Sequence, residues 1–201
     1  MKLVLATGNK GKVREITSMY SAFEVIPYSD IIQAFEIVED KPDFKGNALI
    51  KAQAVYDALN DEEAIVFSDD SGISVEVLDG EPGVFSARYG GPEASDKDNL
   101  YKLMDEVKKK GFKTSPAFYT AAIAIVCKEG EFTTHGWMYG TVITEPRGEG
   151  GFGYDPCFVP LDYDKTLGEL DDKIKSKLSH RSQALANARP ILEVIKAMRE
   201  R

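Results

Sequence analysis

The stretch Ile65-Val66-Phe67-Ser68-Asp69-Asp70-Ser71-Gly72-Ile73 joins an apolar run to two adjacent aspartates. Its apolar start predicts a buried strand, and Gly72 predicts a sharp turn before a second strand over 73–77. Because side chains alternate along a strand, we expect Asp69 and Asp70 to face opposite ways. Two carboxylates at a strand end, with no lysine beside them in the sequence, favour a divalent cation. The alternative is an acidic hairpin turn, since Asp, Ser and Gly are the usual turn residues.

The length and charge of the chain limit the class of protein. A chain of 201 residues fits one domain over 1–201, with room for two lobes and a hydrophobic core. The formal net charge of −8 argues against a general nucleic-acid binder, which needs a basic surface. A small anionic ligand held by a local group of lysines remains compatible with it.

The cysteines and the hydrophobic segments bear on location. Cys127 and Cys157 form no metal-type spacing, and Cys127 lies in an apolar run, so we interpret it as a core residue. The apolar run after Met1-Lys2 is too short for a signal peptide, and no stretch approaches membrane-spanning length. We therefore expect a cytoplasmic protein without membrane contact.

Helices and strands alternate at the start of the chain, and strands cluster in its middle. Helices are predicted at 10–20, at 47–59 with Asn47 as N-cap, from Ser95 or Asp96 to Lys110, and after Ser179, with a kink or break at Pro190. Strands are predicted at 2–6, 23–27, 117–127, 131–142 and 157–159. This order predicts an α/β protein with a mixed sheet, in contrast to a pure doubly wound one.

The first loop lies between a strand and a helix and reads Thr7-Gly8-Asn9-Lys10-Gly11-Lys12. Amides at a helix N-terminus attract anions, and two lysines there oppose the helix dipole unless an anion binds. The loop is not a Walker A motif, because its glycines are too close and no Ser or Thr follows Lys12. It therefore indicates a phosphate site, with a glycine turn and solvated lysines as the alternative.

The motif Gly148-x-Gly150-x-x-Gly153 matches the dinucleotide pattern only superficially. That pattern requires a helix, which Pro156 and Pro160 forbid. We interpret residues 150–155 as a flexible loop that presents Phe152, Tyr154 and Asp155. An aromatic ring between glycines can stack on a purine base, although it could equally plug the core.

Two further segments carry polar side chains of interest. One is a predicted helix start with two potential cations, and the other is a loop with a single acid. With Ser179 as a cap, His180 and Arg181 fall in the first helical turn, where two cations make sense if they face an anion or the carbonyl edge of a base. Lys175 lies just before them. Glu39, by itself, is a loop acid that the sequence alone would place at the surface.

Together these segments resemble the Ham1 family of inosine/xanthosine triphosphate pyrophosphatases. The resemblance runs from about Leu3 to Ala188. The matching pieces are Ala6-Thr7-Gly8-Asn9-Lys10-Gly11-Lys12, Asp69-Asp70-Ser71-Gly72, Pro82-Gly83-Val84-Phe85-Ser86-Ala87-Arg88-Tyr89, Gly151-Phe152-Gly153-Tyr154-Asp155-Pro156 and Ser179-His180-Arg181. Five pieces in register are far more specific than any one of them.

The resemblance implies a fold and an activity. The family is an elongated, two-lobed α/β protein with a mixed sheet flanked by helices and an active-site cleft between the lobes, and it is usually a homodimer. The implied reaction is Mg²⁺-dependent hydrolysis of non-canonical purine triphosphates, ITP, dITP and XTP, to the monophosphate and pyrophosphate. The alternatives are a hydrolase for another modified nucleotide and a nucleotide sensor without catalysis.

The resemblance also assigns roles to residues. It implies that Asp70 accepts a proton and that Glu39 and Asp70 hold Mg²⁺. The implied substrate-binding residues are Thr7, Gly8, Asn9, Lys10, Gly11, Lys12, Ser71, Phe152, Gly153, Tyr154, Asp155, Lys175, His180 and Arg181. The chain departs from the family after Glu39, because it has Lys45-Gly46 where an acidic residue usually precedes the asparagine.

Overall fold

The structure is a computed structural model that describes residues 2–200, apart from the side chains of residues 10, 11 and 15. The chain divides into two compact units. The first unit comprises the chain up to Asp70, Ala121–His135 and the chain from Ala184 onward. The second unit comprises Ser71–Thr120 and Gly136–Gln183.

The strands form one six-stranded sheet in the order β2-β1-β3-β4-β5-β6. Strand β1 pairs in parallel with β2 and β3, whereas β5 and β6 are antiparallel. The strands are β1 (Lys2–Leu5), β2 (Glu24–Pro27), β3 (Val66–Val75), β4 (Thr114–Cys127), β5 (Gly130–Ile143) and β6 (Phe158–Pro160). The α-helices are α1 (Lys10–Met19), α2 (Phe44–Leu59), α3 (Asp96–Lys109), α4 (Asp172–Leu178) and α5 (His180–Arg199). The predicted mixed α/β class is confirmed.

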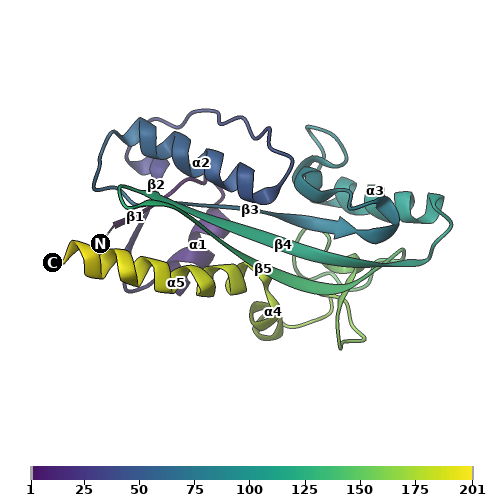
Figure 1. The fold of residues 1–201 in the computed structure, drawn as a ribbon. Coiled ribbons are helices and arrows are strands. Elements are labelled where there is room, and N and C mark those ends of the chain that lie inside the picture. Colours follow the sequence, from purple (N-terminus) through teal and green to yellow (C-terminus); the bar gives the residue numbers. More distant parts are fainter. Residues whose placement is uncertain (1, 201) are drawn as a thin grey trace. The chain divides into compact units, whose positions relative to one another are not determined.

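In the first unit, alternate strand residues belong to two separate hydrophobic layers. Val4 and Val66 pack with the inward side of α2, while Leu5 and Phe67 pack with α1 and α5. Figure 1 shows α2 on one side of these strands and α5 on the other. The period of two along the strands thus explains why helices cover both faces.

In the second unit, α3 supplies the main helical contribution to the core. Its buried Leu100, Leu103, Met104 and Val107 pack with strand and loop residues of that unit. The helix begins with a capping box, in which Ser95 accepts from the Asp98 amide and Asp98 accepts from the Ser95 amide. Of the two predicted caps, Ser95 is therefore the N-cap. None of the helices within residues 2–200 has the length and apolarity to cross a membrane.

The predicted turn at Gly72 is wrong, because β3 continues through it as a single strand. A Cβ on Gly72 would lie 2.6 Å from the Gly83 carbonyl oxygen and closer still to Ser86 Oγ. That hydroxyl accepts a hydrogen bond from the Ile73 amide at 2.9 Å and donates one to the Gly83 carbonyl at 2.6 Å. Glycine is needed here for close approach of the η3 segment (Gly83–Arg88) and makes no turn.

Helices α2 and α4 differ from prediction, and of the kink or break predicted at Pro190 in α5 the structure excludes the break. Helix α2 begins at Phe44 with Asp43 as its N-cap, so the assignment of Asn47 as cap is wrong. Helix α5 continues through Pro190 without a break. The short helix α4 was not predicted, although Asp171 caps it by accepting from the Ile174 amide. Helix ends depend on a few local hydrogen bonds, which the periodic pattern does not carry.

Replacing Gly72 with alanine tests the contact behind β3. Gly72→Ala should lower the free energy of unfolding by about 1–3 kcal/mol, because the added methyl group overpacks against backbone and Ser86. Urea denaturation measures the loss. Gly8→Ala is the matched control for stability, since a Cβ there would meet nothing within 4 Å. Equal stability of the two variants would contradict the close approach.

Candidate functional site

Asp69 and Asp70 lie on opposite faces of β3 and contact lysines from different helices. Lys12 of α1 places its Nζ 2.9 Å from Asp69 Oδ2, and Lys51 of α2 places its Nζ 3.4 Å from Asp70 Oδ1. The Asp69 side chain is fully buried. The predicted opposite orientation of the two aspartates is confirmed, and both helix-borne lysines come from distant parts of the sequence.

Glu39 shares Lys51 with Asp70. Lys51 Nζ donates to Glu39 Oε2 at 2.7 Å, so one ammonium group connects two carboxylates. The loop that carries Glu39 is attached to α2, where Asn47 Oδ1 accepts from the Lys41 amide at 2.9 Å. A Cβ on Gly46 would lie 2.7 Å from Lys41 Cβ, which explains why this chain has glycine there. Asn47 thus helps to position Glu39, a role that differs from capping.

Lys51 belongs to this candidate site, and the sequence interpretation missed it. It lies three residues after Ala48 and one before Ala52, both fully buried on the inward side of α2. A lysine beside an inward apolar stripe is a signal that could have found it, because such a side chain must reach a partner. Its side chain is only 13% exposed, and its partners are the two acids.

The electrostatics of this cluster follow from burial and from the mixture of charges. Burial raises the pKa of Asp70, an effect that Lys51 and Lys12 oppose and that Glu39 and Asp69 reinforce. Burial alone would lower the pKa of Lys51, but Asp70 and Glu39 raise it overall. Asp70 Oδ2 is buried and accepts no hydrogen bond from the described part of the chain. This oxygen therefore retains its full capacity to bind a cation or a proton donor.

The cluster borders a cavity of about 250 Å³ within the first unit. Polar and charged residues contribute to the lining of the cavity. Those residues are Thr7, Lys12, Glu39, Lys51 and Asp69. A space of this size holds several water molecules or a phosphate-sized group.

The loop between β1 and α1 places backbone amides beside this cavity. Thr7 Oγ1 accepts from the Asn9 amide and Asn9 Oδ1 accepts from the Lys12 amide, each at 3.2 Å. A Cβ on Gly8 would meet nothing within 4 Å, so a ligand could approach the backbone there. The predicted roles of Lys10 and Gly11 lie outside what the structure describes.

In the second unit, the glycine loop exposes Phe152 and buries its neighbour. The Phe152 side chain is 70% exposed, whereas Tyr154 is buried and donates from its hydroxyl to the Ser86 carbonyl at 2.7 Å. Two carboxylates accept from consecutive amides of this loop: Asp155 Oδ2 from Phe152 at 3.2 Å, and Asp96 Oδ2 from Gly153 at 3.3 Å. The prediction that the loop presents Tyr154 and Asp155 is wrong, because both are buried, and the core-plugging alternative applies to Tyr154. Phe152 presents an open ring face.

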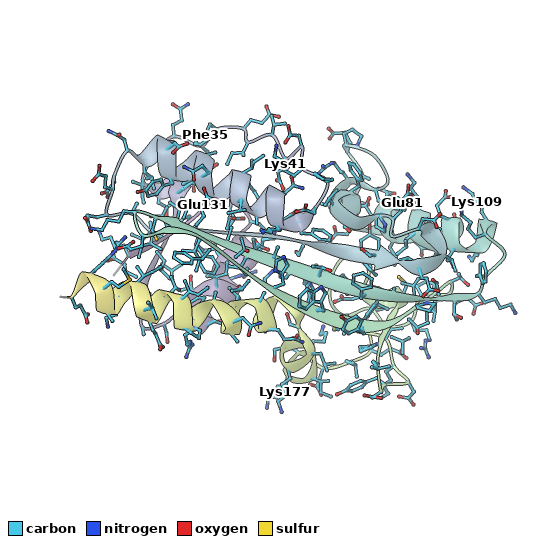
Figure 2. All side chains as sticks on the ribbon, viewed as in Figure 1. Phe35, Lys41, Glu81, Lys109, Glu131 and Lys177 are labelled. Carbon is cyan, nitrogen blue, oxygen red and sulfur yellow. The ribbon has the colours of Figure 1, made fainter. Side chains whose placement is uncertain are left out.

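Asp155 is a buried carboxylate with a strongly shifted pKa. Burial raises its pKa to about 6 from an ordinary value of 3.8, against the lowering effects of the Phe152 amide and Lys175. Lys175 itself is 17% exposed and pairs with Asp172 at 2.9 Å. Lys177 on the same helix points away into solvent (Figure 2). Of these two lysines, Lys175 is the one near the loop.

The start of α5 orients His180 and Arg181. Ser179 caps this turn by accepting from the Ser182 amide at 3.2 Å, as predicted. The His180 ring stacks on buried Tyr119, with ring centroids 4.8 Å apart and planes 15° from parallel. Arg181 is 7% exposed and donates from Nη2 to Ser71 Oγ at 3.0 Å. Both side chains are therefore held in fixed positions, and Tyr119 is a contact that no sequence pattern indicated.

Glu39 and Asp70 fit a magnesium site in which the protein supplies few of the ligands. Within residues 2–200, no group of three or more His, Cys, Asp or Glu side chains is arranged to hold a metal. Magnesium usually takes only one or two protein carboxylates and keeps its waters. The pair Glu39 and Asp70, with the unbonded Asp70 Oδ2, supplies that donor set.

Comparison with known proteins points to one family. Residues 3–191 match the model of the Ham1 family. The dITP/XTP pyrophosphatase of Sulfurimonas denitrificans is 60% identical over 97% of this chain and 100% of that protein. That of Sulfurovum sp. is 58% identical over 98% of this chain and 95% of that protein. The solved Staphylococcus aureus Ham1 protein superposes with a TM-score of 0.87, at 33% identity over 96% of this chain and 98% of that one.

The shifted pKa of Asp155 predicts a pH-dependent loss of stability. Because the fold favours its protonated form, the contribution of Asp155 is fully present below about pH 4 and is lost as pH rises through about 6. Asp155→Asn has no such titration, so its stability relative to the natural chain should grow by on the order of 3 kcal/mol from pH 4 to pH 7. Urea denaturation at several pH values measures this difference.

The matched control is Asp105→Asn, which removes an exposed aspartate from α3. A difference between Asp155→Asn and the natural chain that stays constant over this pH range would show that Asp155 does not titrate as its burial requires.

Proposed function

The chain belongs to the Ham1 family, and we propose that it hydrolyses non-canonical purine nucleoside triphosphates to the monophosphate and pyrophosphate. The proposed substrates are dITP, ITP and XTP, in agreement with the names of its relatives. The observation that carries the proposal is the arrangement of Glu39, Asp70 and Lys51 beside a cavity that the phosphate-type loop also lines.

The charges around this cavity suit a bound triphosphate. A triphosphate carries several negative charges, so a protein of net charge −8 must provide local cations to bind it. Lys12 and Lys51 provide two ammonium groups, and the loop at the start of α1 also lines the cavity. We assign the phosphates to Thr7, Gly8, Asn9, Lys10, Gly11, Lys12 and Ser71.

The metal in this proposal is Mg²⁺, held by Glu39 and Asp70. When bound, Mg²⁺ neutralises phosphate charge and lowers the pKa of a coordinated water. The chain itself contributes a buried carboxylate, Asp70, that can accept the proton of the attacking water. Lys51 fixes the positions of both carboxylates, since each contacts the same ammonium group.

The second unit supplies the groups that we assign to the base. Phe152 offers an exposed ring for stacking, framed by Gly153, Tyr154 and Asp155. Lys175 is assigned to the substrate, and His180 and Arg181 are assigned to the 6-oxo edge of the purine. Donors directed at O6 accept inosine and xanthine and reject adenine, whose 6-amino group would leave buried donors unpaired.

We also propose a location and an assembly. The proposed substrates belong to the free nucleotide pool, which supports a cytoplasmic location. The two cysteines are free and buried, which agrees with a reducing compartment. By resemblance to the family we propose a homodimer formed by the single domain 1–201. Sedimentation equilibrium would measure its mass.

The substrate panel is the direct test of this function. Incubation with dITP, ITP, XTP, ATP and dTTP in the presence of Mg²⁺ should release pyrophosphate rapidly from the first three alone. Orthophosphate from ITP would indicate cleavage of the terminal phosphate. Preference for dTTP would favour a hydrolase of another nucleotide, and tight ITP binding without any product would favour a sensor.

Asp70→Asn tests the assigned proton acceptor. Turnover of dITP should fall by roughly 10²–10⁴-fold, the usual contribution of a general base, while the nucleotide still binds. Steady-state kinetics and calorimetric titration measure the two quantities. Asp105→Asn, which removes an exposed aspartate from α3, controls for the loss of an acidic charge elsewhere. Unchanged turnover in Asp70→Asn would remove this residue from the reaction.

Lys51→Met tests the cation that the two carboxylates share. We expect at least a roughly 10-fold loss of turnover, since breaking a buried ion pair on one side leaves uncompensated acids. Lys45→Met, at an exposed position of the same helix, is the matched control. Equal kinetics of these two variants would show that Lys51 does not organise Glu39 and Asp70.

A further inference from the structure

The loop that carries Phe152 is held by main-chain bonds to carboxylates, and its sequence provides little rigidity. Gly151 and Gly153 flank the ring with φ of +84° and +58°, where glycine is favoured. The Phe152 side chain is 70% exposed and so receives little packing support. A loop of this kind loses much conformational entropy when it takes one shape, so other groups must hold it.

Two acids from different elements hold consecutive amides of this loop. Asp155 accepts from Phe152 three residues earlier in the same segment. Asp96 accepts from Gly153 across 57 positions of sequence, at 3.3 Å. Because the Asp155 contact is local, it shapes the turn. The Asp96 contact attaches the turn to a helix.

Helix α3 holds Asp96 in a fixed position. The Ser95–Asp98 capping box fixes its first turn, and its buried face belongs to the core of the second unit. Asn99 attaches the same turn to the preceding segment, accepting from the Gly90 amide at 2.6 Å and donating to the Ala87 carbonyl at 3.2 Å. Since Ser95 and Asp98 complete the cap, the Asp96 carboxylate is available to the loop.

The charge of Asp96 also affects the titration of other residues in the second unit. It helps to raise the pKa of Asp155, Tyr154 and Tyr119, although burial is the first cause in each case. Tyr119 in turn stacks on His180. The charge of Asp96 therefore acts on residues that we assign to the base or that contact them, and Asp96 comes from an element with no other part in that group.

We propose that Asp96 is a positioning residue for the purine base, acting through the Gly153 amide to hold the Phe152 ring in its stacking position. This role rests on the proposed function of the loop and extends it to a residue outside every segment assigned to substrate. Stacking is made equally in the ground state and the transition state, so its loss raises KM and leaves kcat nearly unchanged.

The first test measures the loop itself and needs no activity. Hydrogen–deuterium exchange of the peptide covering residues 150–155, without nucleotide, should be faster in Asp96→Ala than in the natural chain. Asp96→Asn keeps an acceptor oxygen and should restore slow exchange. Asp105→Ala, at an exposed position of the same helix, is the matched control. Unchanged exchange in Asp96→Ala would overturn the proposal, whatever the substrate is.

The second test measures the effect of Asp96 on the KM for a purine substrate. KM for dITP should rise roughly 3- to 10-fold in Asp96→Ala, as expected for one net hydrogen bond, with Asp96→Asn near the natural value. In a Phe152→Ala background the same substitution should have no further effect, because no ring remains to be positioned. Additive KM effects, or a loss confined to kcat, would overturn the positioning role.

The two tests separate this proposal from the proposed function. If the natural chain releases no pyrophosphate from dITP, ITP or XTP, the proposed function fails, while the exchange result still decides whether Asp96 holds the loop. If pyrophosphate is released and exchange responds but KM does not, Asp96 orders the loop without serving the base, and the inference fails alone.

Discussion

The alternation of side chains along β3 is the constraint on which the acidic site depends. Asp69 and Asp70 are neighbours in sequence, yet one contacts Lys12 of α1 and the other Lys51 of α2. Pairing with β1 fixes the register, with Val4 opposite Val66 and Leu5 opposite Phe67. A slip by one residue would exchange the two aspartates and expose a hydrophobic layer on each face. The fold of the first unit therefore determines which carboxylate meets Glu39.

This arrangement also explains how acids can be buried so close together. Removing carboxylates from water is costly unless cations accompany them, and each aspartate has a lysine within 4 Å. The lysines serve the fold and the proposed reaction at once. They compensate the acids in the folded chain, and they supply positive charge beside the cavity where we assign phosphate.

The sequence indicates periodic features well and contacts between distant segments poorly. The opposite faces of Asp69 and Asp70, the mixed sheet and the Ser179 cap follow from local pattern, and all three are present. Gly72 has the chemistry of a turn, but close approach of η3 makes it a strand residue. Asn47 has the chemistry of a cap, but it binds the amide of Lys41. In both cases a contact with a neighbouring segment of the fold decides which of two roles the residue has.

The groups assigned to the base differ in how firmly they are held, and the difference follows from what each must do. Discrimination by hydrogen bonds requires donors that cannot move to satisfy the wrong base, and Arg181 and His180 are fixed by Ser71 and Tyr119. Stacking discriminates little between purines, so its ring can be carried by a loop. Such a loop still has to present the ring in one place. Carboxylates that bind the backbone achieve this without covering the ring face, because a packed side chain would occupy the surface that the base needs.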